Sequence, residues 1–167
     1  AADDRRMIYL DNAATSFPKP AECLRNALER SLHIGASPGR GGYDRAVEAE
    51  AAVSVVRKKL ARFFGADERH RVCFTSNATD ALNLVLQGLL QPGDHVVSSR
   101  LEHNSVLRPL HHLQRQGRIR FDLVPFDSEG FIEPERVAAA IQPATKLVIL
   151  THASNVLGTV QRVEEIA

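Results

Sequence analysis

Three short polar clusters contain the residues of this chain that could bind a ligand or perform chemistry. They are residues 76–79, residues 102–105 and residues 152–159. Each cluster follows an apolar segment of the kind that forms a strand. If those strands are parallel, the clusters meet at one edge of the sheet, and this edge is where ligands bind in α/β proteins.

The first cluster lies between the apolar segment 72–75 and a helix that the apolar period predicts over 80–90. A helix N-terminus has unpaired N–H groups and a partial positive charge, so this turn can hold a phosphate. The same turn also suits a plain helix cap, in which a side chain such as that of Asn77 or Thr79 accepts a backbone N–H. The segment by itself leaves both interpretations open.

His103 and Asn155 are the candidates in the other two clusters. The imidazole of His103 can stack on a flat ring, and it can act as an acid or base because imidazole titrates near neutrality. Asn155 can donate a hydrogen bond to a ring oxygen and accept one from a substrate amine. Simpler interpretations are a capping or surface histidine, and an asparagine that forms a turn with Gly158. Together with the turn at 76–79, the two residues favour one site for a ligand with a phosphate and a flat ring.

The order of elements predicts the fold class. Strands are expected at 72–75, 95–98, 119–125 and 147–151, with helices at 80–90, 101–115 and 133–141 between them. This alternation predicts an α/β fold with a mostly parallel sheet and helices on both faces. The fully apolar segment 147–151 indicates a strand that is covered on both sides.

The first 65 residues are expected to be mainly helical. A short strand is expected at 7–10, a polar loop at 11–16, and helices at about 20–32 and 44–64, in that order. Residues 35–42 contain four glycines and one charge, Arg40, and cannot form regular structure. This loop is either a flexible connector or a segment that approaches a ligand or a partner subunit.

Bulk composition excludes several classes of protein. The 167 residues fit one domain, and 44% of them are apolar, which is enough for a core. A net charge of +1 gives no electrostatic basis for binding nucleic acid or membranes. Cys23 and Cys73 lack the spacing of a metal site or disulfide framework, and Cys73 is expected to be buried in a strand. The lack of a signal-peptide pattern or a long apolar run favours a cytoplasmic location.

The sequence resembles the class V aminotransferase-like enzymes that use pyridoxal phosphate, and within them the cysteine desulfurases and selenocysteine lyases. The resemblance rests on five blocks in the family's order, at 9–16, 36–42, 75–83, 102–105 and 151–159. It implies a fold-type-I transferase dependent on pyridoxal 5'-phosphate. Residues 1–167 would form the amino-terminal part of its large domain, with 1–42 as an arm and loop and the carboxyl-terminal half absent.

The resemblance also implies roles for single residues at the cofactor. Ala78 and Thr79, with Asn77 beside them, fall where the family binds the cofactor phosphate. Many members have two threonines there, and Ala78 retains only the backbone N–H of the first. His103 falls on the histidine that stacks over the pyridine ring, and it is the catalytic candidate of this chain. Asn155 falls on the asparagine near the ring oxygen and the substrate.

The same resemblance implies a substrate pocket and partners. Ala13 and Ala14 would line the substrate pocket together with Asn155, and the loop around Arg40 would lie near a homodimer interface. The expected partners are an amino acid such as cysteine, a second copy of the chain and a sulfur-acceptor protein.

Family members are considerably longer, and their Schiff-base lysine and catalytic cysteine follow beyond position 167. The chain has four lysines (Lys19, Lys58, Lys59 and Lys146), and none falls in the polar clusters. We therefore expect a portion of an enzyme that converts L-cysteine to L-alanine and passes sulfur to an enzyme cysteine. We expect the isolated chain to be inactive, and the sequence leaves open whether it binds pyridoxal 5'-phosphate without that lysine.

Other interpretations remain open. The chain could belong to another class V enzyme, namely a selenocysteine lyase, sulfinate desulfinase, aminotransferase or epimerase. It could also be a non-catalytic, truncated α/β module. A nicotinamide-binding domain is disfavoured, because no Gly-x-Gly-x-x-Gly turn follows a strand.

Overall fold

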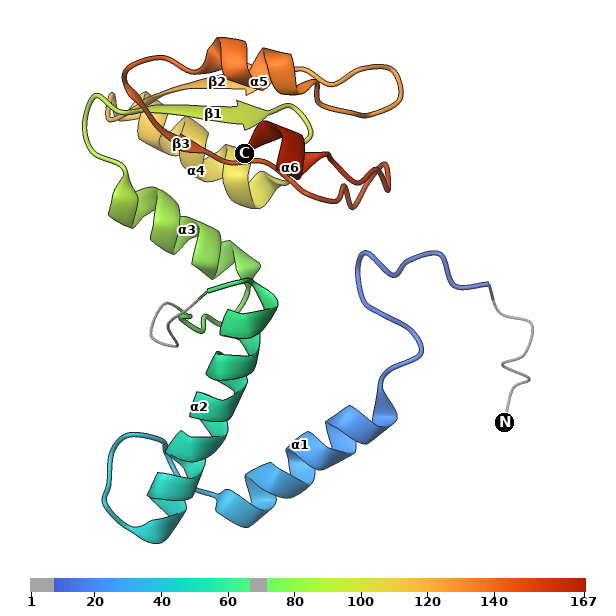
Figure 1. Ribbon diagram of the computed structural model, residues 1–167, viewed down its shortest axis with the longest axis vertical. Coiled ribbons are helices and arrows are strands. Elements are labelled where there is room, and N and C mark those ends of the chain that lie inside the picture. The colour runs from blue at the N-terminus through green and yellow to red at the C-terminus, as the bar shows by residue number, and fades with distance from the viewer. Residues whose placement is uncertain (1–7, 67–71) are drawn as a thin grey trace. The chain divides into compact units, whose positions relative to one another are not determined.

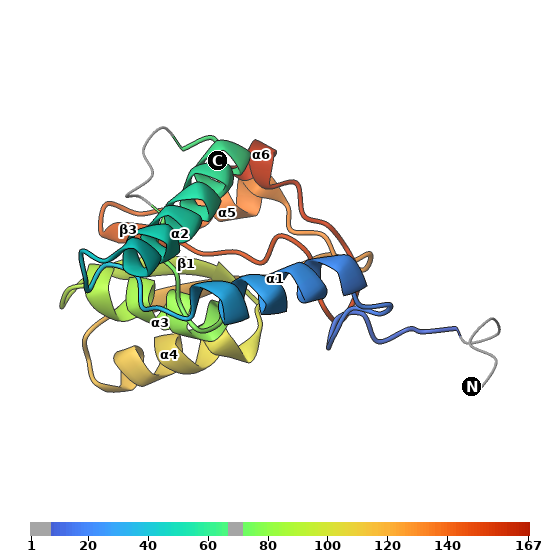
Figure 2. The same ribbon diagram turned by 90° about the horizontal axis from the view of Figure 1, so that it is seen from below.

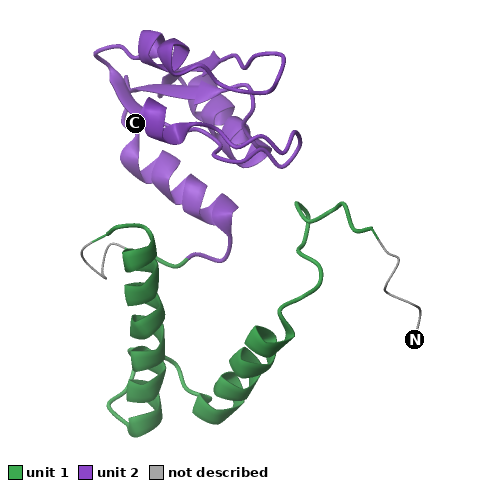
Figure 3. Cartoon of the chain, turned by 45° about the vertical axis from the view of Figure 1, so that its right-hand side comes forward, with its two compact units in different colours: residues 1–74 green, residues 75–167 purple. Residues whose placement is uncertain are grey.

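The computed structural model describes residues 8–66 and 72–167, and the chain divides into two compact units, 1–74 and 75–167 (Figure 3). Helices α1 (Ala21–Ile34) and α2 (Asp44–Phe63) lie in the first unit. The second unit contains, in chain order, α3 (Ala78–Leu89), β1 (His95–Ser99), α4 (Asn104–Arg115), β2 (Arg120–Val124), α5 (Pro134–Ala140), β3 (Thr145–Val148) and α6 (Val163–Ile166), as Figure 1 shows.

The sheet of the second unit is parallel, as the order of elements predicts. Its strand order is β2-β1-β3, and β1 pairs in parallel with both neighbours. All five residues of β1 are buried, because strands flank it on two edges and helices cover its two faces. The carboxyl ends of the three strands therefore lie at one edge of this sheet.

Helices cover both faces of the sheet (Figures 1 and 2). Successive side chains of a strand point to opposite faces, so Val96 and Val97 belong to different cores. Val96 packs in a cluster with residues of α3 and α4 that includes Leu86 and Leu110. Val97 packs on the other face in a cluster that includes Val137 of α5. The predicted arrangement of helices on both faces is thus confirmed.

The helices and loops of the first unit lie where the sequence predicts them. Residues 11–16 form turns, residues 35–42 have no regular structure, and α1 and α2 lie where helices are expected. Gly35 follows α1 with a φ of 54°, a left-handed conformation that glycine adopts without steric cost. Its N–H donates to the carbonyl of Ser31 and closes the last turn of α1.

Two predicted strands are wrong. Residues 72–75 and 8–10 have no strand structure, and Met7 lies outside the described residues. A strand forms only where another strand completes its ladder of backbone hydrogen bonds. Within the described residues, the only paired strands are β1 with β2 and β1 with β3. Residues 8–10 and 72–75 therefore have no strand to pair with.

Two predictions of burial are also wrong. Cys73 is exposed, because the segment that carries it is not part of the sheet. β3 ends at Val148, which is 37% exposed, and alternate residues of this strand are exposed rather than covered on both faces. Among the described residues β3 is an edge strand that pairs only with β1, and its alternating burial shows that one of its faces is incompletely covered.

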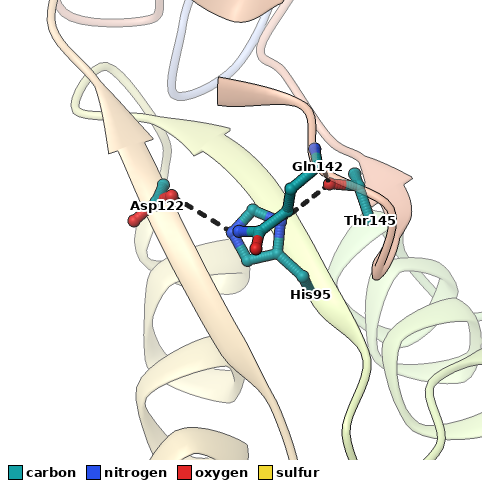
Figure 4. A network of polar contacts seen from close by, with 4 residues as sticks. All are labelled: His95, Asp122, Gln142 and Thr145. Carbon is teal, nitrogen blue, oxygen red and sulfur yellow. Dashed lines mark hydrogen bonds and ion pairs between the residues drawn. The ribbon is translucent and has the colours of Figure 1, made fainter. Parts of the chain in front are cut away.

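A polar network joins all three strands near the start of β1 (Figure 4). His95 is 1% exposed, and its Nε2 lies 3.2 Å from Oδ2 of Asp122 on β2. Its Nδ1 lies 2.8 Å from the hydroxyl of Thr145 on β3, and that hydroxyl oxygen accepts the backbone N–H of Gln142. A buried imidazole with partners on both nitrogens satisfies the polar atoms that burial would otherwise penalise.

The loop between β2 and α5 is closed by Asp127. Its Oδ1 accepts the backbone N–H groups of Phe131 and Glu129, each at 2.9 Å. The N–H of Phe131 is the main reason that the pKa of the Asp127 carboxyl lies below its usual range, and the other backbone N–H groups and Arg162 act in the same direction. The loop is therefore better held by the ionised side chain.

Replacing Asp127 by asparagine should remove a pH-dependent part of the stability. A carboxyl with a lowered folded-state pKa stabilises the fold above its unfolded value of 3.8, and this contribution is lost as the pH falls through the folded value. We expect Asp127→Asn to lower the urea midpoint at pH 7 and to match the unaltered chain at pH values well below 3.8. Glu129→Gln, the same loss of charge in the same loop, should change neither midpoint. An equal effect of Asp127→Asn at both pH values would contradict the prediction.

Candidate functional site

The turn before α3 is a well-formed helix cap that still has free donors. Oδ1 of Asn77 accepts the N–H of Asp80 at 2.9 Å, and Nδ2 of Asn77 donates to the carboxylate of Asp80 at 3.4 Å. The backbone N–H groups of Ala78 and Thr79 and the hydroxyl of Thr79 have no partner among the described residues. The cap and the anion site are thus compatible, because Asn77 serves the cap while Ala78 and Thr79 keep donors free.

His103 is the N-cap of α4, which begins at Asn104 and not at Leu101 as predicted. The correction has a simple cause: Nδ1 of His103 accepts the N–H of Ser105 at 3.1 Å, and this bond starts the helix. Since Nδ1 accepts an N–H, a neutral ring carries its proton on Nε2. Nε2 has no partner among the described residues, and the ring is exposed.

Thr79 and His103 line the same pocket. This pocket lies between α3 and α4 and has a volume of about 460 Å³, within the usual range for small-molecule sites. Its other polar lining comes from both helices: Asn83 and Gln87 from α3, and Asn104, Ser105, Arg108 and His112 from α4. A helix start and an imidazole, predicted from separate clusters, are therefore brought together.

The remaining predicted residues do not line the α3–α4 pocket. Asn155 is exposed in a turn, where the buried hydroxyl of Ser154 accepts the N–H groups of the two residues after Asn155. Ala13 and Ala14 are exposed in the first unit, where the N–H of Ala14 donates to the carbonyl of Asp11. Their substrate roles stay predictions.

Glu102 lies near the carboxyl end of β1, and the sequence alone does not reveal its structural role. One carboxylate oxygen, Oε1, accepts the hydroxyl of Ser99 at 2.9 Å and the backbone N–H of Thr151 at 2.5 Å. Burial raises the pKa of the Glu102 carboxyl above its usual range, and the two hydrogen bonds lower it in part. The sequence signal is an acidic residue three positions beyond a buried strand, but Thr151 lies 49 positions away.

The chain matches the family model for aminotransferase class V over residues 8–167 and therefore belongs to that family. Among curated relatives, the probable cysteine desulfurase of Methanothermobacter thermautotrophicus is 37% identical over 97% of this chain and 40% of its own length. Among solved structures, the apo cysteine desulfurase from Thermococcus onnurineus NA1 is 32% identical, with a TM-score of 0.86 over 97% of this chain and 40% of that one.

A further similar structure is that of SspA in complex with cysteine, with 27% identity and a TM-score of 0.83 over 96% of this chain and 46% of that one. The resemblance to class V enzymes is thus confirmed, and the fold is that of the corresponding part of a fold-type-I enzyme. Cysteine desulfurases depend on pyridoxal phosphate. The chain spans about 40% of the length of the curated relatives that it matches. Within the described residues, no helix has both the length and the apolar character that crossing a membrane requires.

Proposed function

We propose that this chain is a portion of a pyridoxal-phosphate-dependent cysteine desulfurase. It would contribute the residues that bind the cofactor phosphate and the residue that stacks on the cofactor ring. The observation that carries the proposal is that Thr79 and His103, at the starts of two different helices, line one pocket. The names of its relatives favour cysteine desulfurase over the other class V reactions. The reaction would convert L-cysteine to L-alanine and pass the sulfur to an enzyme cysteine.

The start of α3 fits the phosphate end of this cofactor. The backbone N–H groups of Ala78 and Thr79 and the Thr79 hydroxyl, which have no partner in the described part of the chain, offer three donors at the positive end of the helix. The negative charge of the Asp80 carboxylate in the same turn would repel a bound phosphate. That carboxylate accepts a hydrogen bond from the side-chain amide of Asn77. Asn77 would support the phosphate site by holding the first turn of α3 in place.

His103 fits the ring end. The bond from Ser105 N–H to Nδ1 holds the imidazole at the start of α4, so one ring face can stack on a planar ligand. Nε2 carries a proton that can be donated at the reacting atoms. The cofactor supplies the electron sink for bond cleavage at the amino acid. Asn155 would contact the ring oxygen and the substrate, and Ala13 and Ala14 would line the substrate pocket.

The partners and location belong to the same proposal. They are cysteine or a related amino acid as the substrate, a second copy of the chain, a sulfur-acceptor protein, and the cytoplasm as the compartment. The solved complex of SspA with cysteine supports the substrate class. None of the four lysines lines the α3–α4 pocket, so we expect this chain alone to bind pyridoxal phosphate reversibly and to release no sulfide from cysteine.

Replacing Thr79 by valine should weaken the binding of pyridoxal phosphate about tenfold, the effect of losing one hydrogen bond to a charged group. Thr79→Ser keeps the hydroxyl and should bind within about twofold of the unaltered chain. Dissociation constants would be measured by visible circular dichroism of the bound cofactor, with inorganic phosphate as competitor. Equal affinities of the valine and serine variants would show that the hydroxyl is not a phosphate ligand. If the unaltered chain binds no pyridoxal phosphate, the proposed cofactor site is overturned.

A further inference from the structure

Glu102 connects two loops that leave the sheet at the same edge. Its carboxylate accepts from Ser99, the last residue of β1, and from the N–H of Thr151, three residues beyond the end of β3. His103 follows Glu102 directly, and Asn155 lies four residues after Thr151. We name this arrangement of Ser99, Glu102 and Thr151 the Glu102 bridge.

The bridge continues the pairing of β1 and β3 beyond the point where their backbones part. Ile149 is the last residue of that segment that bonds to β1, through its N–H to the carbonyl of Val97 and through its carbonyl to the hydroxyl of Ser98. Beyond Ile149, the hydrogen bonds among the described residues that join the two strand ends pass through the Glu102 carboxylate, while Leu150 packs against the cluster that contains Val97. The hydrogen bonding that sets the spacing of the two loops therefore depends on one side chain.

The chemistry of the bridge is that of an acceptor with two neutral donors. Among the described residues, no lysine, arginine or histidine forms an ion pair with Glu102. Ser99 is fully buried, and its oxygen also accepts the N–H of Leu101 at 3.2 Å. Loss of the carboxylate would leave a buried hydroxyl and a backbone N–H without an acceptor, and each such group costs stability.

We propose that Glu102 is a positioning residue of the cofactor site: its bridge to Ser99 and Thr151 sets the spacing between His103 and the loop that carries Asn155. The inference rests on the proposed function for the meaning of that spacing. Glu102 itself does not line the α3–α4 pocket, so it acts through the two loops rather than on a ligand. The bridge requires an oxygen acceptor at Oε1 and does not require a negative charge.

Two substitutions separate the bridge from an acid–base role. Glu102→Gln keeps an acceptor oxygen without the charge, whereas Glu102→Ala removes both. In the full chain, hydrogen exchange of the Thr151 amide measured by NMR should accelerate at least about tenfold in Glu102→Ala and stay within about threefold in Glu102→Gln. The affinity for pyridoxal phosphate should fall in Glu102→Ala and be retained in Glu102→Gln.

Val137→Ala provides a control for general destabilisation. Val137 is buried on the face covered by α5 and takes no part in the hydrogen bonds of the bridge, so its truncation lowers stability without removing a bridge bond. We expect its Thr151 exchange and cofactor affinity to match the unaltered chain under native conditions. If Glu102→Ala does not fold, Ser99→Ala, which removes one donor, should give a smaller acceleration at Thr151.

The outcomes decide the two proposals separately. Unchanged Thr151 exchange in Glu102→Ala, or equal losses in Glu102→Gln and Glu102→Ala, would overturn the bridge. Faster exchange in Glu102→Ala with an unchanged cofactor affinity would overturn the positioning role. If the unaltered chain binds no pyridoxal phosphate, the proposed function fails, while Thr151 exchange still decides whether the bridge holds the loops.

Discussion

Replacing Leu86 by alanine is expected to lower the free energy of unfolding of residues 75–167 by about 3 kcal/mol. Leu86 is fully buried on α3 and packs in the cluster that contains Val96 of β1 and Leu110 of α4. Truncation removes buried methyl groups and leaves a cavity that a tightly packed core closes only in part. The loss is a large share of the stability of a small unit.

Leu84 gives a matched control on the same helix. Its side chain is 62% exposed, so Leu84→Ala is the same chemical change without the same burial. We expect Leu84→Ala to stay within about 0.5 kcal/mol of the unaltered chain. Stability would be measured as the exchange free energy of the most protected β1 amides. Equal losses in the two variants would mean that α3 is not packed on the sheet as described.

The Leu86 experiment also bears on function, because α3 positions Thr79 in the α3–α4 pocket. If α3 loosens, the free N–H groups at its start lose their fixed direction, and binding of an anion weakens with them. Leu86→Ala should therefore reduce the affinity for pyridoxal phosphate, whereas Leu84→Ala should not.

Local sequence pattern was sufficient for most helices and for the strands of the sheet. The apolar period of α3 and the branched residues Val96 and Val97 of β1 predict their elements without knowledge of distant partners. Residues 72–75 have the same strand character but no ladder partner among the described residues, and a partner is a long-range property. The prediction that Cys73 is buried was wrong for the same reason.

The features of the candidate site also differ in how far the local sequence predicts them. The sequence places Thr79 and His103 together by assuming parallel strands at 72–75 and 95–98, and the two residues do line one pocket although residues 72–75 form no strand. The start of α4 at Asn104 depends on one side-chain bond to Ser105, which periodicity does not reveal. The bond from Thr151 to Glu102 joins residues far apart in the chain, and no local pattern predicts it.

Replacing His95 by alanine should lower the stability of the same unit by about 3 kcal/mol, from a cavity and two lost hydrogen bonds. A carboxylate only accepts, so Nε2 of His95 donates to Asp122. In the neutral ring, Nδ1 then accepts the hydroxyl proton of Thr145. The alanine variant leaves that hydroxyl without an acceptor and disconnects β1 from both neighbouring side chains.

Two further variants show how much of the lost unfolding free energy comes from the bond to Thr145 and how much from the bond to Asp122. His95→Asn places an amide oxygen close to the position of Nδ1, so it should keep the Thr145 bond and lose less than half as much as His95→Ala. Asp122→Asn retains an acceptor at a side chain that is 62% exposed, and it should cost less than about 0.5 kcal/mol. Exchange free energies of the β1 amides would measure all three. A loss in Asp122→Asn as large as that in His95→Ala would show that the exposed partner, and not the buried bond to β3, stabilises the start of the sheet.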